Sequence, residues 1–286
     1  MSLLLALSAG AQYHSLLWKI SGNGLKESSF LYGTMHTSDA RVFAFGDSVM
    51  PSFASAKAFA MELDPDKAMN MGVIAKLMMG KGYSLKKMIP EEDYKTLDSI
   101  VQHEIGLSVA MFDNVAPVFT MTILEASGLA LNDSSANGNT DVLDMYFYKR
   151  AKKPSLGKEK KKKIIGIETV DEQLEALNSL NYQEQADLLV KEIHSFLENK
   201  TEGIDLVKFY LDQNLDSLAT NDVDAQMPAK FYKALVTDRN IRMANRIGVF
   251  VKEQSSFIAI GALHLPKEEG VISLLRKKGF TVEPLR

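Results

Sequence analysis

Two histidines far apart in the sequence occur in the same local pattern, in which an apolar run leads into a glycine and a histidine follows three residues later. The first copy reads FLYGTMH, with Gly33 and His36, and the second reads FIAIGALH, with Gly261 and His264. Apolar runs of this length are typical of β-strands, and glycine permits the close approach of another backbone. Open α/β sheets bind their ligands at the carboxyl ends of strands. The repeated pattern therefore predicts that the two imidazoles belong to one site.

Two glutamates occur in a similar setting. Glu62 closes the apolar run AFAM, and Glu168 follows the run KIIGI. Imidazole and carboxylate groups together suit Zn, Mn, Co or Fe ions. An ion with an open coordination position lowers the pKa of a bound water, and a free carboxylate can accept the proton that the water loses. The sequence therefore indicates a hydrolytic metal site that combines His36 and His264 with these glutamates.

Each of these residues also has a structural interpretation. A lone histidine at a strand end more commonly serves as a hydrogen-bonding group, and a glutamate that closes a strand often faces solvent, but the repetition of both settings favours a site. His103 and His194 lie in charged helical stretches and are expected at the surface. The sequence contains no His-Glu-x-x-His, Gly-x-Ser-x-Gly or P-loop signature, so the common metallopeptidases, serine hydrolases and nucleotide-binding proteins are not indicated.

The composition is that of an ordinary globular protein. Of the 286 residues, 46% are apolar and 24% are charged. The net charge of -3 argues against a dedicated nucleic-acid-binding protein. The absence of cysteine excludes disulfides, thiolate zinc sites and a cysteine nucleophile. No stretch after the N-terminus approaches the ~20 apolar residues that a membrane-spanning helix needs.

The N-terminal segment MSLLLALSAGAQ combines an apolar run with small residues near Ala11. This pattern indicates the remnant of an export signal over residues 1–12, although no Lys or Arg precedes the run. The alternative is an apolar N-terminus that frays. We expect an exported protein, located in the periplasm, at the cell surface or outside the cell, with a single domain over residues 13–286.

The elements that must position the site follow from apolar periodicity and from turn and capping signals. Strands are expected at 16–20, 30–32, 58–65, 163–169, 257–260 and 280–283, and the first two form a hairpin. Helices are expected at 45–56, 69–79, 90–105, 115–127, 141–152, 170–180 and 268–278, with two or three more between 183 and 251. Thr169 is expected to cap the helix at 170–180, with Glu172 completing a capping box. Single strands between helices predict an α/β (α+β) fold with a central sheet and large helical insertions.

Several of these segments together resemble the TraB/GumN (Tiki-like) family. They occur in the family's order and span nearly the whole chain after residue 12. The matching segments are LWKI at 17–20, LYGTMH at 31–36, MELD at 61–64, GIET at 166–169 with Glu172 and Gln173, Arg239 with Asn240, GALHLP at 261–266, and Gly270 with Val271. The chain departs from the family at Lys267, where the family usually has a glycine.

The resemblance implies a metal-dependent hydrolase, since Tiki-like members are Mn- or Co-dependent proteases that act on extracellular peptides. It also implies a central mixed sheet of two pseudo-repeated halves, because the family is related to the erythromycin-esterase-like and ChaN-like superfamily. Carried over to this sequence, the ligands of a divalent ion (Mn, Co or Zn) are His36, His264 and Glu62, and Glu168 matches the family's central glutamate. The residues expected to line the substrate cleft are Gly33, Asp141, Gln173, Arg239, Asn240 and Gly261.

We therefore expect an exported metal-dependent peptidase that acts on a peptide or protein substrate, without nucleic acid and without a membrane span. The oligomeric state stays open. Glu62 or Glu168 is expected to act as the general base, and Arg239 to stabilise the developing oxyanion. The alternative from another class is a protein that binds a peptide or a haem-like ligand in the same cleft without turnover. The methionine-rich stretch at 69–79 could line such a pocket, although methionines at this spacing more commonly belong to a core.

Overall fold

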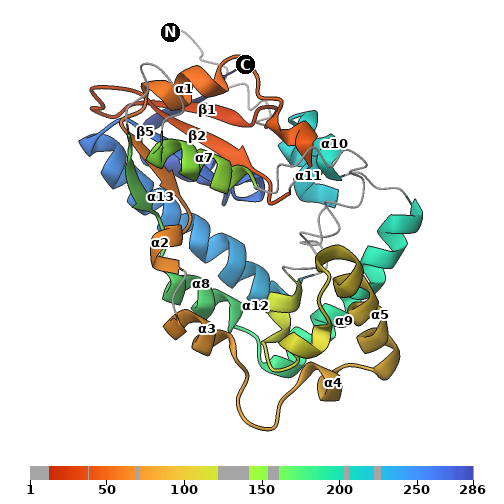
Figure 1. The fold of residues 1–286 in the computed structure, drawn as a ribbon. Helices are drawn as coiled ribbons and strands as arrows, with labels where there is room; N and C mark the ends of the chain where they lie inside the picture. The colour runs from red at the N-terminus through yellow and green to blue at the C-terminus, as the bar shows by residue number, and fades with distance from the viewer. Residues whose placement is uncertain are drawn as a thin grey trace, which may run out of the picture.

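The computed structural model of the chain describes residues 13–37, 39–68, 71–121, 142–153, 161–202, 206–221 and 227–285. The predicted export signal, the predicted cleft residue Asp141 and the second half of the helix expected at 115–127 lie outside the described residues. Figure 1 shows a sheet with covering helices at one end of the molecule and a group of helices at the other. The long helix α13 (Asp238–Glu253) extends from the first part towards the second.

The sheet has six strands in the order β4-β3-β5-β2-β1-β6. Their bounds are β1 (Leu17–Gly22), β2 (Ser29–Thr34), β3 (Ala58–Met61), β4 (Lys163–Gly166), β5 (Ser256–Gly261) and β6 (Phe280–Leu285). β1 pairs antiparallel with β2 and with β6, whereas the pairs β2–β5, β5–β3 and β3–β4 are parallel. The predicted fold class, with its mixed sheet and its N-terminal hairpin, is confirmed.

The parallel strands carry both histidine patterns to one edge of the sheet. β3 and β5 are almost entirely buried, which explains their nearly continuous apolar sequences. β2 and β5 are neighbours, and their register places Gly33 opposite Ile260 and Thr34 opposite Gly261. Because parallel strands run in the same direction, both Gly-x-x-His patterns end at the same edge. β3, which leads directly into Glu62, ends there as well.

Helices fill the two long connections between strands of the sheet, which agrees with the helical insertions predicted from the sequence. The connection from β3 to β4 contains α2 (Pro65–Ala68), α3 (Met71–Leu77), α4 (Leu85–Met88), α5 (Glu91–Ile105), the 3-10 helix η2 (Val109–Phe112) and α7 (Leu143–Lys152). The connection from β4 to β5 contains α8 (Val170–Leu177), α9 (Tyr182–Glu202), α10 (Leu206–Leu211), α11 (Leu215–Asn221), α12 (Ala229–Tyr232), the π-helical segment η4 (Lys233–Thr237) and α13. Shorter connections contain the 3-10 helices η1 (Ala40–Phe43) and η5 (Ala262–His264) and the helices α1 (Val49–Ser55) and α14 (Val271–Lys277).

Two parts of the helix prediction differ from the structure. Between 183 and 251 the chain forms more and shorter helices than the two or three expected, because Pro228 starts α12 and Gln213, with a φ of 54°, interrupts the chain between α10 and α11. The helix expected at 268–278 begins only at Val271. The preceding Gly270 lies so close to the carbonyl oxygen of Pro266 that an added Cβ would be 1.8 Å from it, so a tight turn occupies the residues where the helix was expected to begin.

The main hydrophobic core packs α1 and α7 against the sheet. The ring centroid of Phe147 on α7 lies 5.3 Å from that of Phe53 on α1 and 5.1 Å from that of Phe257 on β5, which are distances typical of favourable aromatic pairs. Buried residues of α13, including Met243 and Ile247, belong to the same core. This core fixes α7 and α13 relative to the strand ends that carry the histidines.

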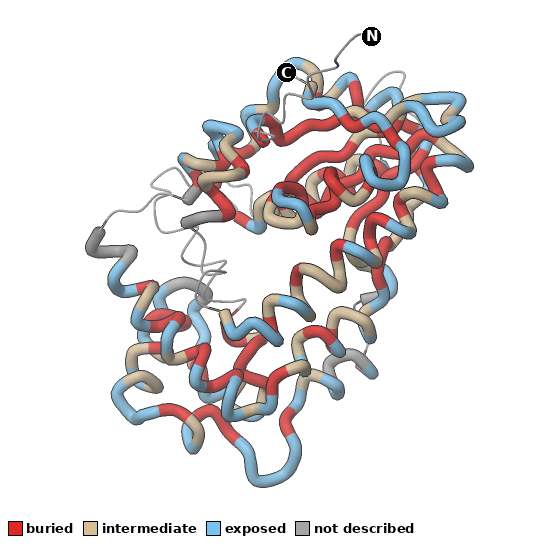
Figure 2. Tube along the Cα trace, turned by 180° about the vertical axis from the view of Figure 1, so that it is seen from behind, coloured by how far each residue is buried: buried red, intermediate tan, exposed pale blue. Residues whose placement is uncertain are grey.

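A second hydrophobic cluster lies among the helices at the other end of the molecule. Its buried members include Leu97 and Val101 on α5, Leu189 and Ile193 on α9, and Phe231 on α12. It shares no residue with the main core, and Figure 2 shows buried positions in both parts. Whether residues 13–286 fold as one domain stays a prediction. Within the described ranges, no helix has the length and apolar character needed to cross a membrane.

Candidate functional site

The two glutamates lie side by side because the chain continues the β3–β4 pairing beyond both strands. The N–H of Ile167 donates to the carbonyl of Met61 (2.8 Å), and the N–H of Glu168 donates to the carbonyl of Glu62 (2.8 Å). Glu62 Oε1 accepts the N–H of Gly261 at the end of β5 (2.8 Å). Backbone pairing thus brings the ends of β3, β4 and β5 together around these carboxylates.

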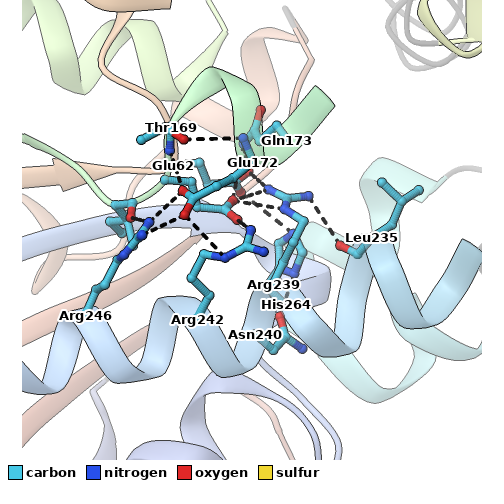
Figure 3. Close-up of polar contacts among 12 residues, drawn as sticks. Glu62, Thr169, Glu172, Gln173, Leu235, Arg239, Asn240, Arg242, Arg246 and His264 are labelled. Carbon is cyan, nitrogen blue, oxygen red and sulfur yellow. Dashed lines mark hydrogen bonds and ion pairs between the residues drawn. The ribbon is translucent and has the colours of Figure 1, made fainter. Parts of the chain in front are cut away.

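Arg239 links the two carboxylates (Figure 3). Its Nη2 donates to Glu62 Oε2 (2.5 Å) and to Glu168 Oε2 (2.8 Å), and its Nε donates to Glu168 Oε2 (2.9 Å). The Gln173 amide lies within 3.4 Å of Glu62 Oε2 and 3.3 Å of Glu168 Oε2. Arg242 donates to the other oxygen of Glu168 (3.1 Å). The Glu168 side chain is completely buried and is paired with both Arg239 and Arg242.

The arginines come from one side of α13. Arg239, Arg242 and Arg246 are spaced three and four residues apart, which places them on one helix face. Arg246 donates twice to Glu172 (2.7 Å each). Glu172 in turn completes the predicted capping box with Thr169, which is therefore confirmed. α13 is in this way held along the segment that runs from β4 into α8.

The charge of Arg239 controls the ionisation of Glu62. Burial raises the pKa of Glu62, but the charge of Arg239 opposes this effect. His264, His36 and the N–H of Gly261 lower the pKa further, so that it lies well below the usual range. Glu62 is therefore a carboxylate, and not a carboxylic acid, at neutral pH.

His264 has a defined tautomer. Its Nδ1 lies 2.7 Å from Asn240 Oδ1, and Asn240 Nδ2 donates to the carbonyl of Glu269 (2.9 Å), which orients the amide with its oxygen towards the ring. Nδ1 must therefore carry the proton, so that the lone pair of Nε2 is free. Nε2 lies 3.9 Å from Glu62 Oε1. Burial, together with the charge of Arg239, lowers the pKa of His264 to about 4, so the ring is neutral at physiological pH.

His36 reaches the same edge from β2 and faces an aspartate that the sequence did not indicate. Its Nε2 lies 3.2 Å from Oδ2 of Asp144, which lies in the first turn of α7. The effect of His36 on the pKa values of Glu62 and His264 reflects its proximity to both. Asp144 lies on the buried face of α7 with Leu143, Phe147, Tyr148 and Ala151. Asp144 could have been predicted from the sequence as the single acidic residue on an apolar helix face.

Of the two glycines of the repeated pattern, Gly33 is the one that close packing requires. A Cβ on Gly33 would lie 2.9 Å from Leu265 Cδ1, whereas one on Gly261 would make an ordinary contact, 3.4 Å from Glu62 Oε1. Lys267 has a φ of 70°, a value that glycine adopts more readily. This conformation gives a physical reason for the glycine that the family usually has at this position.

The histidine and carboxylate side chains at this edge form two pairs, and each pair is chemically suited to bind a divalent metal ion. Ligand atoms about 2.0–2.2 Å from one ion lie roughly 3–4 Å apart. His264 Nε2 with Glu62 Oε1 (3.9 Å) and His36 Nε2 with Asp144 Oδ2 (3.2 Å) both have this separation. In the present side-chain arrangement, no group of three or more His, Asp or Glu residues in the described part of the chain could hold a metal ion. A complete site requires the two pairs to close on one ion.

Comparison with known proteins identifies the family. The model of the TraB/PrgY/gumN family matches residues 16–284, so the chain belongs to this family. The curated relatives include Metalloprotease TIKI2 of Danio rerio (24% identity, 94% of this chain and 61% of the relative) and Metalloprotease TIKI2 of Xenopus tropicalis (26%, 94% and 60%). Metalloprotease TIKI homolog of Nematostella vectensis is 24% identical over 95% of this chain and 67% of its own length.

The chain thus spans about three fifths to two thirds of these relatives. No solved structure shows significant similarity to it. The predicted family resemblance is confirmed, and the relationship to proteins named as metalloproteases is a distant one.

Proposed function

We propose that this protein is a metal-dependent hydrolase, specifically a peptidase, that binds a divalent ion through His36, His264 and Glu62. The observation that carries the proposal is the free Nε2 lone pair of His264, which faces the ionised Glu62 at 3.9 Å. The family membership and the relatives named as metalloproteases also support it. Mn, Co and Zn all accept this combination of nitrogen and carboxylate ligands.

The residues around the ion have distinct roles. A bound divalent ion lowers the pKa of a water molecule and polarises a carbonyl group. The low pKa of Glu62 favours its role as a ligand, since a ligand must be deprotonated. Glu168 holds Arg239, and the oriented guanidinium favours negative charge on a substrate oxygen. The general base is then Glu62 or Glu168, of which Glu62 is the more exposed (17% against 0%).

We assign the substrate to the class of peptides or proteins, on the basis of the relatives' names. Gln173 borders both glutamates and is a candidate substrate contact. We also propose that the protein is exported and that residues 13–286 form a single domain. Both of these proposals rest on the sequence.

A cleavage screen tests the proposal. The protein is freed of metal with a chelator, resupplied with Mn²⁺, Co²⁺ or Zn²⁺, and incubated with an unstructured peptide library that is analysed by mass spectrometry. We expect metal-stimulated cleavage by the wild type. His264→Gln and His36→Ala should each reduce it at least about 100-fold, because each removes a ligand. His194→Ala is the matched control, because His194 is an exposed histidine that pairs with Asp93 among the distant helices.

Two outcomes would contradict the proposal. Full activity of either ligand variant would show that the two imidazoles do not share one site. Tight binding of a peptide or haem without any product would instead support the non-catalytic alternative.

A further inference from the structure

Asp144 is a buried carboxylate that is not among the three metal ligands of the proposed function. It is only 7% exposed, and it lies on α7 over the end of β2. Its Oδ1 accepts the hydroxyl of Thr34 (2.9 Å), the second residue of the first Gly-x-x-His pattern. This hydrogen bond engages one oxygen of the carboxylate. The other oxygen, Oδ2, lies towards His36.

Oδ2 is buried and has no hydrogen-bond partner within the described part of the chain. His36 Nε2 lies 3.2 Å from it, but without the geometry of a hydrogen bond. A buried carboxylate oxygen without a donor is costly, because it has lost its water and gained nothing in exchange. In native proteins such an atom calls for an explanation, such as a catalytic role, a bound water or a bound ion.

The group opposite Oδ2 is one that binds metals. The side chain of His36 is 66% exposed, whereas that of Asp144 is 10% exposed and hydrogen-bonded to Thr34. The buried carboxylate and the exposed imidazole form a pair that is open to solvent on the histidine side. The arrangement mirrors Glu62 and His264 on the neighbouring strand end, where the histidine is the fixed partner.

We propose that Asp144 is a ligand of the divalent ion, and that Asp144 Oδ2 with His36 Nε2 forms one half of its site while Glu62 with His264 forms the other. This inference rests on the proposed function. The resulting set of two imidazole nitrogens and two carboxylate oxygens suits Mn, Co or Zn. A divalent ion held in this way would give Asp144 Oδ2 the partner that it lacks.

The variant Asp144→Asn separates this role from a purely structural one. The substitution keeps the shape of the side chain and the acceptor for Thr34, but it removes the charge. Metal affinity is measured by isothermal titration calorimetry with Mn²⁺, Co²⁺ and Zn²⁺, and stability by thermal unfolding with and without the ion. We expect the affinity to fall at least tenfold, while the melting temperature of the metal-free protein stays the same or rises because the unpaired oxygen is gone.

Asp98→Asn is the matched control. Asp98 also accepts a hydroxyl, that of Ser108 (2.8 Å), but it lies on α5 among the distant helices. This variant should keep the metal affinity of the wild type. An unchanged affinity in Asp144→Asn overturns the inference. So does a loss of affinity accompanied by a larger drop in metal-free stability than Asp98→Asn shows, because Asp144 would then act as a structural partner of His36.

A second measurement needs no variant. Carbon-13 NMR of the side-chain carboxylates in the wild type should show the Asp144 resonance shifting with Zn²⁺, while that of Asp98 stays in place. An Asp144 resonance that does not respond to Zn²⁺ bound by the protein overturns the inference. Suppose that the wild type binds the ion, that His264→Gln does not, and that Asp144→Asn still does. That result would contradict the role of Asp144 but not the proposed function. If the wild type binds none of the three ions, both the role of Asp144 and the proposed function are wrong.

Discussion

Asn240 was expected to contact substrate, but its amide is fully engaged inside the protein. The oxygen faces His264 Nδ1 and the nitrogen donates to Glu269, and the residue is 1% exposed. Its position in the first turn of α13, next to Arg239, lets one helix turn orient both a histidine and a guanidinium. A role in orienting His264 therefore accounts for Asn240 better than substrate contact does. Histidine ligands of metals are commonly oriented through their second ring nitrogen in this way.

Replacing Asn240 tests this orientation. In Asn240→Ala we expect metal affinity to fall by roughly 10–100-fold, because Nδ1 loses its acceptor and the ring no longer favours one tautomer. Nitrogen-15 NMR of the histidine ring should change from a protonated Nδ1 to a mixture of tautomers. Asn240→Asp keeps an acceptor for Nδ1 and should retain the wild-type tautomer. An unaltered ring spectrum in Asn240→Ala would argue against the orienting role.

At the scale of elements, the site depends on how tightly β2 meets the turn after β5. This turn, η5, carries His264, and it packs directly against Gly33. A Cβ on Gly33 would lie 3.1 Å from Ala262 Cα and 2.9 Å from the buried Leu265. The glycine of the first pattern thus makes room for the turn that carries the histidine of the second.

Gly33→Ala should consequently destabilise the protein by about 1–3 kcal/mol, the usual effect of overpacking a buried position. Urea unfolding measures the loss. Gly46→Ala is the control, since Gly46 is exposed and a Cβ there would meet nothing within 4 Å, and it should change stability by less than about 0.5 kcal/mol. Equal stability of the two variants would mean that β2 and η5 separate easily.

At the scale of the whole molecule, the segment that carries Arg239 runs from one hydrophobic cluster to the other. Leu235, whose carbonyl accepts Arg239 Nη1 (3.3 Å), packs on the helical cluster. Met243, one turn beyond Arg239 on α13, belongs to the core beneath the sheet. Sites between two packed units are common locations for ligands. The ion pairs of α13 hold this helix to the ends of β3 and β4 and to α8.

This arrangement predicts a pH dependence of stability. Arg246, aided by the N–H and hydroxyl of Thr169, lowers the pKa of Glu172 from 4.5 to about 2 against the effect of burial. A carboxylate whose pKa is lower in the folded state stabilises it above the unfolded pKa. The contribution is therefore complete above about pH 4.5 and is lost as the pH falls towards 2.

Urea unfolding at a series of pH values measures the effect. Glu172→Gln should be less stable than the wild type at pH 7, and the difference should shrink between pH 4.5 and 2. A stability difference that is the same at pH 7 and pH 2.5 would mean that the Glu172–Arg246 pair does not contribute.

The sequence by itself determined the features that depend on neighbouring residues. Apolar runs indicated the strands, the Thr169–Glu172 spacing indicated a capping box, and the two Gly-x-x-His patterns indicated histidines at strand ends. These features are local, because periodicity, capping and turn chemistry act over a few residues.

Only the tertiary structure decided which distant side chains meet. Arg239 reaches Glu62 across 177 residues, and Thr34 reaches Asp144 across 110 residues. Such contacts depend on the order of the strands and on how α7 and α13 pack over their ends, and no local pattern records either. The sequence therefore indicated the two histidines, whereas the aspartate opposite His36 and the engagement of Asn240 with His264 emerged only once the sheet had brought them together.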